Sequence, residues 1–214
     1  MQVEFKVFYF NPIRECTWLV WDEGMHCAII DPGCASGREF ERLEQFVTEK
    51  GLKPEAIWLT HAHFDHILGL DAVRRRWNIP VWMHREEVQQ LPMAHRMAAW
   101  MDLQLEEPKG PFNLLEGGER LHLGKAVFQV IHTPGHTSGC VCYYNEDSGL
   151  LFSGDTIFEG SIGRTDLPTG DPNAILDSVR TRLLCLPDST RILPGHGYPT
   201  TIGREKVDNL FLRP

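Results

Sequence analysis

Four side chains that can bind metal ions lie within the short segment 60–66. His61 and His63 are two residues apart at the end of a predicted strand, so both side chains point the same way and can hold one ion. Asp65 and His66 follow one turn later, where the chain enters the next predicted helix, and can serve a second ion nearby. So dense a group of ligand types has a low false-positive risk as a motif, and it predicts a metal site.

One segment cannot supply every ligand for two ions, and three more candidates follow strands elsewhere in the chain. His136 follows the predicted strand 126–131, Asp155 follows the predicted strand 150–153, and His196 follows the last predicted strand. Each of the three comes directly after a glycine, which lets backbone approach closely. Loops at strand ends are where an α/β scaffold carries its functional residues, so we expect these side chains to meet.

The elements that must position these residues alternate between strands and helices. Strands are predicted over 3–10, 16–21, 27–30, 56–60, 81–84, 120–122, 126–131, 140–144, 150–153 and 191–193. Helices are predicted over 36–50, 68–77, 85–105 with an early kink at Pro92, and 171–184, while 106–113 is predicted as a loop. This order predicts an α/β fold in which two mixed β-sheets pack face to face with helices on both outer sides, a four-layer αββα sandwich.

Length and composition exclude several classes of protein. The 214 residues predict one domain over 1–214, and 42% hydrophobic residues are enough for a core. The net charge of −8, with Arg74–Arg76 as the only dense basic run, argues against nucleic-acid binding. No apolar stretch approaches the roughly 18 residues of a membrane span. We therefore expect a small-molecule substrate, no nucleic acid and no membrane, and a monomer or small homo-oligomer.

The cysteines and the N-terminus indicate a cytoplasmic protein. The six cysteines form no CxxC pair and are too few for a disulfide scaffold, so we expect reduced thiols. The first residues lack the basic region followed by an apolar region that a signal peptide needs.

The chain resembles the metallo-β-lactamase fold superfamily, from Asp31-Pro32-Gly33 to His196. The resemblance implies two metal ions and fills all seven ligand positions. The first metal would be held by His61, His63 and His136, the second by Asp65, His66 and His196, and Asp155 would bridge them. Nitrogen and carboxylate ligands suit zinc, although iron or manganese would also fit.

Two neighbouring ions would share a water and lower its pKa towards about 7, so that a metal-bridging hydroxide could attack a carbonyl. Asp65 would ligate and also orient the nucleophile or move its proton. A thiolate, with a pKa near about 8.5, is a leaving group that needs little help.

Within the superfamily, the chain is most similar to short, single-domain type II glyoxalase-like hydrolases, also called hydroxyacylglutathione hydrolase-like. The similarity rests on the segments 133–137, 154–158, 160–166, 194–197 and 201–205. It implies a thioesterase that cleaves S-lactoylglutathione or a related S-acyl thiol. Longer glyoxalase II enzymes carry a helical C-terminal domain that binds glutathione, and the short stretch after His196 predicts that this domain is absent.

Two residues near the ligand loops are candidates for substrate binding. Arg164 lies in a glycine-flanked loop after Asp155, and Tyr198 follows His196 by two positions. An internal ion pair between Arg164 and Asp166 is the competing interpretation for that arginine. The methionine-rich helix over 85–105 is interpreted as core packing, with a lid as the alternative.

Other functions stay open at this point. Persulfide dioxygenases resemble the chain, including its Gly163–Asp166 loop, and use one Fe(II) bound by the residues that match His61, His136 and Asp155. A lactonase or β-lactamase, a nuclease and a binding module without catalysis are further alternatives. Metal identity, metal stoichiometry and oxygen uptake would distinguish the dioxygenase from the hydrolase.

Overall fold

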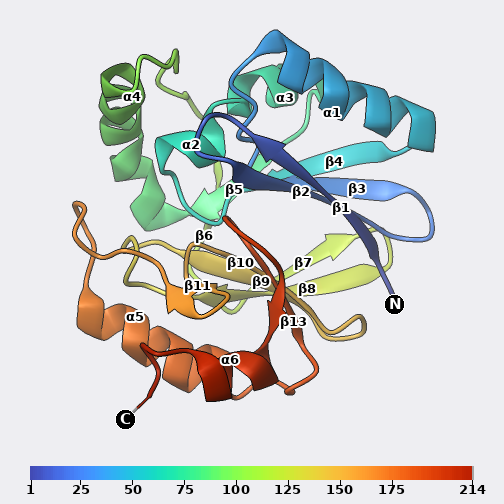
Figure 1. The fold of residues 1–214 in the computed structure, drawn as a ribbon. Coiled ribbons are helices and arrows are strands. Elements are labelled where there is room, and N and C mark those ends of the chain that lie inside the picture. The colour runs from blue at the N-terminus through green and yellow to red at the C-terminus, as the bar shows by residue number, and fades with distance from the viewer. Residues whose placement is uncertain (214) are drawn as a thin grey trace.

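Two six-stranded sheets pack face to face, and helices cover the outer side of each (Figure 1). The computed structural model describes residues 1–213. The predicted four-layer α/β architecture is confirmed, and both large sheets mix parallel and antiparallel pairs, as the sequence predicts.

The N-terminal sheet has the strand order β1-β2-β3-β4-β5-β6. Its strands are β1 (Glu4–Phe10), β2 (Glu15–Trp21), β3 (His26–Ile30), β4 (Lys53–Trp58), β5 (Val81–His84) and β6 (Asn113–Leu115). The first three strands pair antiparallel, whereas β3 to β6 run parallel. Parallel neighbours end at the same edge, so the loops after β3, β4 and β5 lie together at one end of the sheet.

The C-terminal sheet has the order β14-β13-β10-β9-β8-β7. Its strands are β7 (Arg120–Leu123), β8 (Ala126–His132), β9 (Val141–Asn145), β10 (Leu150–Gly154), β13 (Arg191–Pro194) and β14 (Thr200–Thr201). A small separate hairpin pairs β11 (Ile157–Phe158) with β12 (Ser161–Ile162). Because β10 and β13 run parallel, the loops that carry Asp155 and His196 leave the sheet side by side.

Helices from each half of the chain cover the nearer sheet (Figure 1). The first half supplies α1 (Gly37–Lys50), α2 (Phe64–Ile67), α3 (Leu70–Trp77) and α4 (Leu91–Trp100). The second half supplies α5 (Pro172–Ser178), which continues as a π-helical turn over Val179–Leu183, and α6 (Ile202–Asp208).

The α1 helix shows why some elements follow from local sequence. The Ser36 side chain accepts a hydrogen bond from the Glu39 backbone N–H and caps the first turn. Gly51 ends the helix in the left-handed conformation, with φ of 66°. Leu43 and Val47 bury one face against the sheet. The two caps set the bounds of the helix predicted over 36–50.

The predicted helix over 85–105 is wrong in extent and in the role of Pro92. A 3₁₀ helix occupies Arg85–Gln90, and α4 begins at Leu91 and ends at Trp100. Pro92 lies in the first turn of α4, where its missing N–H has no intrahelical acceptor to lose. The proline therefore starts the helix instead of kinking it.

Aromatic side chains fill the space between the two sheets. The Trp58 ring packs on Phe128 and Tyr143, with centroid separations of 4.9 and 5.3 Å. Two buried polar groups also cross the layer: Tyr143 Oη donates to the Leu59 carbonyl at 2.7 Å, and Trp18 Nε1 donates to the Pro194 carbonyl at 2.9 Å. Leu59 and Pro194 adjoin the loops of His61 and His196, so this core fixes the two sheets where those loops begin.

All six cysteines are free thiols, and Cys185 alone among them is exposed. Within residues 1–213, no helix combines the length and the apolar character that a membrane span requires.

Candidate metal centre

The structure brings all seven predicted metal-site residues to one end of the sandwich. His61 and His63 lie in the loop after β4, and the following α2 helix carries Asp65 and His66. The other three come from loops of the second sheet: His136 after β8, Asp155 after β10 and His196 after β13.

The side chains form two clusters that each suit one ion. Ligand atoms of His61, His63 and His136 all lie within 4.8 Å of one another, and so do those of Asp65, His66 and His196. We refer to them as the three-histidine cluster and the Asp65 cluster.

Asp155 lies between the two clusters and contacts both. Its Oδ1 lies 3.5 Å from His66 Nε2 in the Asp65 cluster. Its Oδ2 lies 3.6 Å from His136 Nε2 in the three-histidine cluster and 3.6 Å from His196 Nε2. One carboxylate can therefore face both ions.

The unsatisfied polar atoms of the site match a divalent cation. His61 Nε2, His66 Nε2, His136 Nε2 and Asp155 Oδ1 are buried and have no hydrogen-bond partner. Such orphaned buried atoms are rare in folded proteins. In each of these histidines the other ring nitrogen contacts a protein oxygen, so Nε2 is the atom left for a ligand. The residues thus fit bound metal, and the nitrogen and oxygen donors suit zinc, iron or manganese.

Burial keeps the three-histidine cluster neutral. It lowers the pKa of His63 to about 3 and lowers that of His61 well below its usual value, with help from neighbouring imidazoles. Metal binding requires the neutral imidazole. These rings are already neutral at neutral pH, so they do not have to release a proton when metal binds.

The Asp65 cluster has the opposite charge balance. Burial disfavours the charged form of His66, but the Asp65 and Asp155 carboxylates outweigh it and raise the pKa well above the usual value. For Asp155, burial is likewise outweighed, here by His66 and His196, and its pKa falls well below the usual value. A divalent cation at this point would take the place of the His66 proton between the carboxylates.

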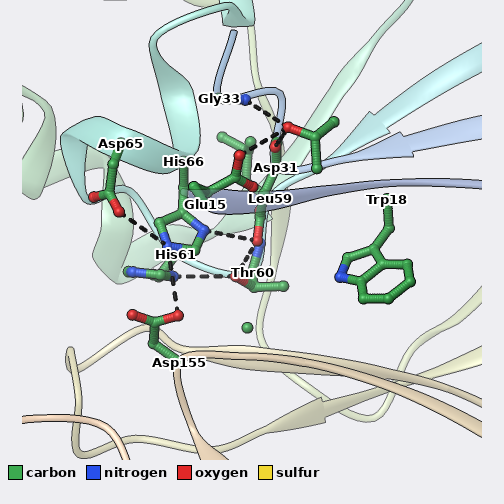
Figure 2. A network of polar contacts seen from close by, with 12 residues as sticks. Glu15, Trp18, Asp31, Gly33, Leu59, Thr60, His61, Asp65, His66 and Asp155 are labelled. Atoms are coloured by element: carbon green, nitrogen blue, oxygen red, sulfur yellow. Dashed lines mark hydrogen bonds and ion pairs between the residues drawn. The ribbon is translucent and has the colours of Figure 1, made fainter. Parts of the chain in front are cut away.

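Asp31 orients one histidine from each cluster (Figure 2). Its Oδ2 accepts from Thr60 Oγ1 at 2.6 Å and lies 3.1 Å from His66 Nδ1. Its Oδ1 accepts from the Thr60 backbone N–H at 2.7 Å, and Thr60 Oγ1 lies 3.1 Å from His61 Nδ1. Asp31 is not among the residues predicted for the site. Its position after a buried strand, directly before Pro32-Gly33, was the available signal.

Glu87 joins the two loops of the three-histidine cluster, and it too is absent from the residues predicted for the site. The carboxylate is fully buried and accepts from the Ala62 backbone N–H at 2.7 Å. It also accepts from Thr137 Oγ1 at 2.6 Å and from the Gly139 backbone N–H at 3.0 Å. Burial raises the pKa of Glu87 to about 7, although the three donors act to lower it.

The two predicted substrate residues are placed differently. A cavity of about 330 Å³ opens over the centre, and Arg164 lines it beside His63, Asp65 and Asp155. The Arg164 guanidinium forms a two-point ion pair with Asp166, with both N–O distances 2.8 Å. Tyr198 is 69% exposed and does not line the cavity.

The family of the chain follows from comparison with known proteins. Residues 16–196 match the metallo-β-lactamase superfamily. The chain belongs to this superfamily. The resemblance of the sequence motifs to it is confirmed.

Two superfamily members are similar to the chain over most of its length. It is 43% identical to the probable metallo-hydrolase YqgX of Bacillus subtilis over 187 residues, which cover 87% of each chain. It is 37% identical to the hydroxyacylglutathione hydrolase GloC of Haemophilus influenzae over 198 residues, which cover 91% of each chain.

Solved superfamily structures agree with the fold. The BLEG-1 B3 metallo-β-lactamase superposes with a TM-score of 0.91 at 38% identity, covering 99% of this chain and 100% of that one. The structure of TTHA1623 in a di-iron-bound form superposes with a TM-score of 0.88 at 40% identity, covering 97% of this chain and 100% of that one. The structure of ETHE1 from Myxococcus xanthus superposes with a TM-score of 0.78 at 28% identity, covering 97% of this chain and 83% of that one.

Proposed function

We propose that the protein is a binuclear metal-dependent hydrolase of thioesters, with S-lactoylglutathione or a related S-acyl thiol as substrate. The observation that carries the proposal is the pair of clusters on either side of Asp155. In them, the Nε2 atoms of three histidines and Oδ1 of Asp155 are buried without a hydrogen-bond partner. Among the relatives, GloC is a hydroxyacylglutathione hydrolase, and this similarity supports the reaction class.

In this proposal His61, His63 and His136 would hold the first ion, Asp65, His66 and His196 would hold the second, and Asp155 would contact both. Zinc is the first choice, and iron or manganese also fits the donors. Two bound ions would supply Lewis-acid activation of a water and of the substrate carbonyl at neutral pH.

Asp65 is the residue placed to handle a proton. Its Oδ2 lies 3.1 Å from His196 Nε2, and both residues line the cavity. Burial opposes its ionisation, yet His66 and His196 hold its pKa below the usual value. Asp65 is therefore a carboxylate at neutral pH, able to accept a hydrogen bond from the attacking water and orient it.

The cavity supports a substrate whose leaving group departs as an anion. The described residues that line it include no lysine, tyrosine or cysteine, and its histidines are assigned to metal in this proposal, so Asp65 is the one side chain left to protonate a leaving group. A thiolate has a conjugate-acid pKa near about 8.5 and can leave without such a donor, whereas an alkoxide or amide needs one. This favours thioesters over ordinary esters and amides.

The direct test is thiol release from S-lactoylglutathione by protein loaded with zinc and shown to hold two ions per chain. We expect release that disappears when the metal is chelated and returns when zinc is restored. Full metal content without release from this or other thioesters would contradict the proposal.

A glutathione persulfide dioxygenase with one Fe(II), bound by His61, His136 and Asp155, is the second candidate. The similarity to ETHE1 from Myxococcus xanthus and the Gly163–Asp166 loop favour it. One iron per chain, with oxygen uptake on glutathione persulfide and no thioester cleavage, would establish this alternative in place of the hydrolase.

Replacing Asp65 with alanine should separate the two ions. We expect Asp65→Ala to lose the ion of the Asp65 cluster and most hydrolysis, while the three-histidine cluster keeps its own ion, because no side chain of that cluster changes. Metal analysis together with thiol release measures both effects. Hydrolysis at the wild-type rate would exclude a mechanism that needs two metals.

A further inference from the structure

Five apolar side chains from separate parts of the fold line the cavity above the metal centre: Ile13, Phe64, Met97, Phe158 and Leu167. We refer to these five side chains together as the apolar wall. Met97 belongs to α4 and Phe158 to β11, so the wall is built from both halves of the sandwich. The other lining residues are Arg164 and five of the candidate metal ligands, so the apolar side chains are the part of the cavity that remains to contact the organic part of a ligand.

No uncompensated cation among the described residues lines this cavity. Its one permanent cation, Arg164, is held by Asp166 at 2.8 Å through two nitrogens. Asp65 and Asp155 add negative charge at the base. Two bound divalent ions would outweigh those two carboxylates at the base, where they would attract the carbonyl oxygen, and this leaves the apolar wall to the rest of the substrate.

We infer that, among the S-acyl thiols that it hydrolyses, the enzyme favours those whose acyl group is an uncharged alkyl chain lying against this wall. The inference rests on the proposed thioester hydrolysis. It deepens that function by stating the acyl class, because an acyl group that ends in a carboxylate would lose its hydration against the wall, where the described side chains offer no unpaired cation.

A series of acyl groups on one carrier tests the inference. We expect kcat/KM to rise from S-acetyl- to S-butanoyl- to S-hexanoylglutathione by about fourfold per methylene while the chain stays on the wall, which corresponds to ~0.8 kcal/mol per buried CH₂. S-succinylglutathione, with four carbons like the butanoyl ester but an added carboxylate, should be much the poorer substrate of that pair. A flat series, or equal rates for butanoyl and succinyl esters, would overturn the inference.

Two methionines near the end of α4 give a matched pair of variants. Met97→Ser should flatten the chain-length series, because Met97 lines the cavity. Met101→Ser should leave the series unchanged, because Met101 is 52% exposed and lies outside the cavity lining. An equal change of the chain-length series in both variants would argue against binding of the acyl chain at the apolar wall.

Binding without turnover separates this inference from the proposed function. The thioethers S-methyl- and S-hexylglutathione cannot be hydrolysed, and calorimetry on metal-free protein should show the tighter binding for the hexyl compound. Equal binding would contradict the wall. Failure to hydrolyse every thioester, combined with a clear preference for hexyl, would overturn the proposed function and leave the apolar pocket standing.

A different observation concerns Glu87, the carboxylate behind the three-histidine cluster. Its acceptor contacts reach Ala62, which stands between His61 and His63, and Thr137, which directly follows His136. Gly139 completes the contact, and a Cβ at that position would lie 2.6 Å from Glu87 Oε1. The carboxylate therefore depends on a glycine for its approach to the second loop.

We propose that Glu87 is a positioning residue that sets the separation of the two loops and thereby the geometry of the three-histidine cluster. In the described contacts, the two carboxylate oxygens of Glu87 face three hydrogen-bond donors and no acceptor. Both positions must therefore be oxygen for all three donors to have an acceptor. In Glu87→Gln, the amide nitrogen must face the N–H of Ala62 or the donors of Thr137 and Gly139, and one loop loses its attachment.

Cobalt and zinc report on this geometry directly. We expect Glu87→Gln to bind zinc about 10–100-fold more weakly at the three-histidine cluster, as for other residues that orient ligands, and to alter the visible absorption of the cobalt-substituted protein. The control Glu86→Gln makes the same change one position earlier, where the side chain accepts only from Gln89, and should leave both readouts unchanged.

Thr137→Val and Thr137→Ser keep the test decisive if Glu87→Gln does not fold. Valine removes one of the three donors and should reproduce part of the effect, whereas serine keeps the hydroxyl and should restore it. Wild-type zinc affinity and an unchanged cobalt spectrum in Glu87→Gln or Thr137→Val, even with lowered thermal stability, would reduce Glu87 to a structural role.

Discussion

Asp155→Ala is expected to release both metal ions and to abolish hydrolysis. The Asp155 carboxylate faces His66 at 3.5 Å and both His136 and His196 at 3.6 Å, and among residues 1–213 no other carboxylate is paired with histidines of both clusters. Loss of a residue that only orients a ligand typically costs about 10–100-fold in affinity or activity, and loss of the shared ligand should exceed that range. Elemental analysis of the purified variant and thiol release measure the two effects.

Asp177→Ala is the matched control, because Asp177 is an exposed aspartate on α5 whose carboxylate makes no contact with the site. It should keep two ions per chain and the wild-type rate. Circular dichroism should show both variants folded. Two firmly bound ions in Asp155→Ala would mean that Asp155 does not bridge them, and the proposed arrangement would be wrong.

Sequence reasoning succeeded where structure is determined locally. The α1 helix carries its own caps at Ser36 and Gly51, so its bounds follow from neighbouring residues. The strand β6 (Asn113–Leu115) was missed because it has three residues and depends on pairing with β5, far away in the sequence. The 3₁₀ helix before α4 was missed because the apolar spacing continues through it, and spacing alone does not reveal the hydrogen-bond pattern.

The same division separates the site residues that were predicted from those that were missed. The seven candidate ligands are histidines and aspartates at strand ends, a pattern visible in the chain itself, although their role as ligands stays a prediction. Asp31 and Glu87 act through partners 35 and up to 52 residues away, which only the fold brings close. Tyr198 follows His196 by two residues, but the chain turns at Gly197, with φ of 79°, and leaves the ring in solvent.

Asp31→Asn is expected to weaken metal binding in the Asp65 cluster by about 10–100-fold and to lower hydrolysis by a similar factor. Oδ1 of Asp31 accepts a hydrogen bond from the Thr60 backbone N–H. Oδ2 accepts one from the Thr60 hydroxyl and lies beside His66 Nδ1. An amide nitrogen at either end meets a donor, so either Thr60 or the His66 ring loses its support. Asparagine tolerates the left-handed backbone of Asp31, with φ of 49°, so the turn itself should persist.

Asp22→Asn distinguishes orientation of a ligand from stabilisation of a turn. Asp22 is also a buried aspartate that accepts from backbone N–H groups, those of Gly24, His26 and Lys125, but it follows β2 at the end of the sheet away from the metal centre. Both variants should lower the free energy of unfolding of the metal-free protein. Only Asp31→Asn should weaken zinc binding in competition with a chromophoric chelator. A change in stability alone does not alter zinc affinity in the chelator competition as long as the protein stays folded. Equal zinc affinities in the two variants would therefore show that Asp31 supports the fold without orienting His66.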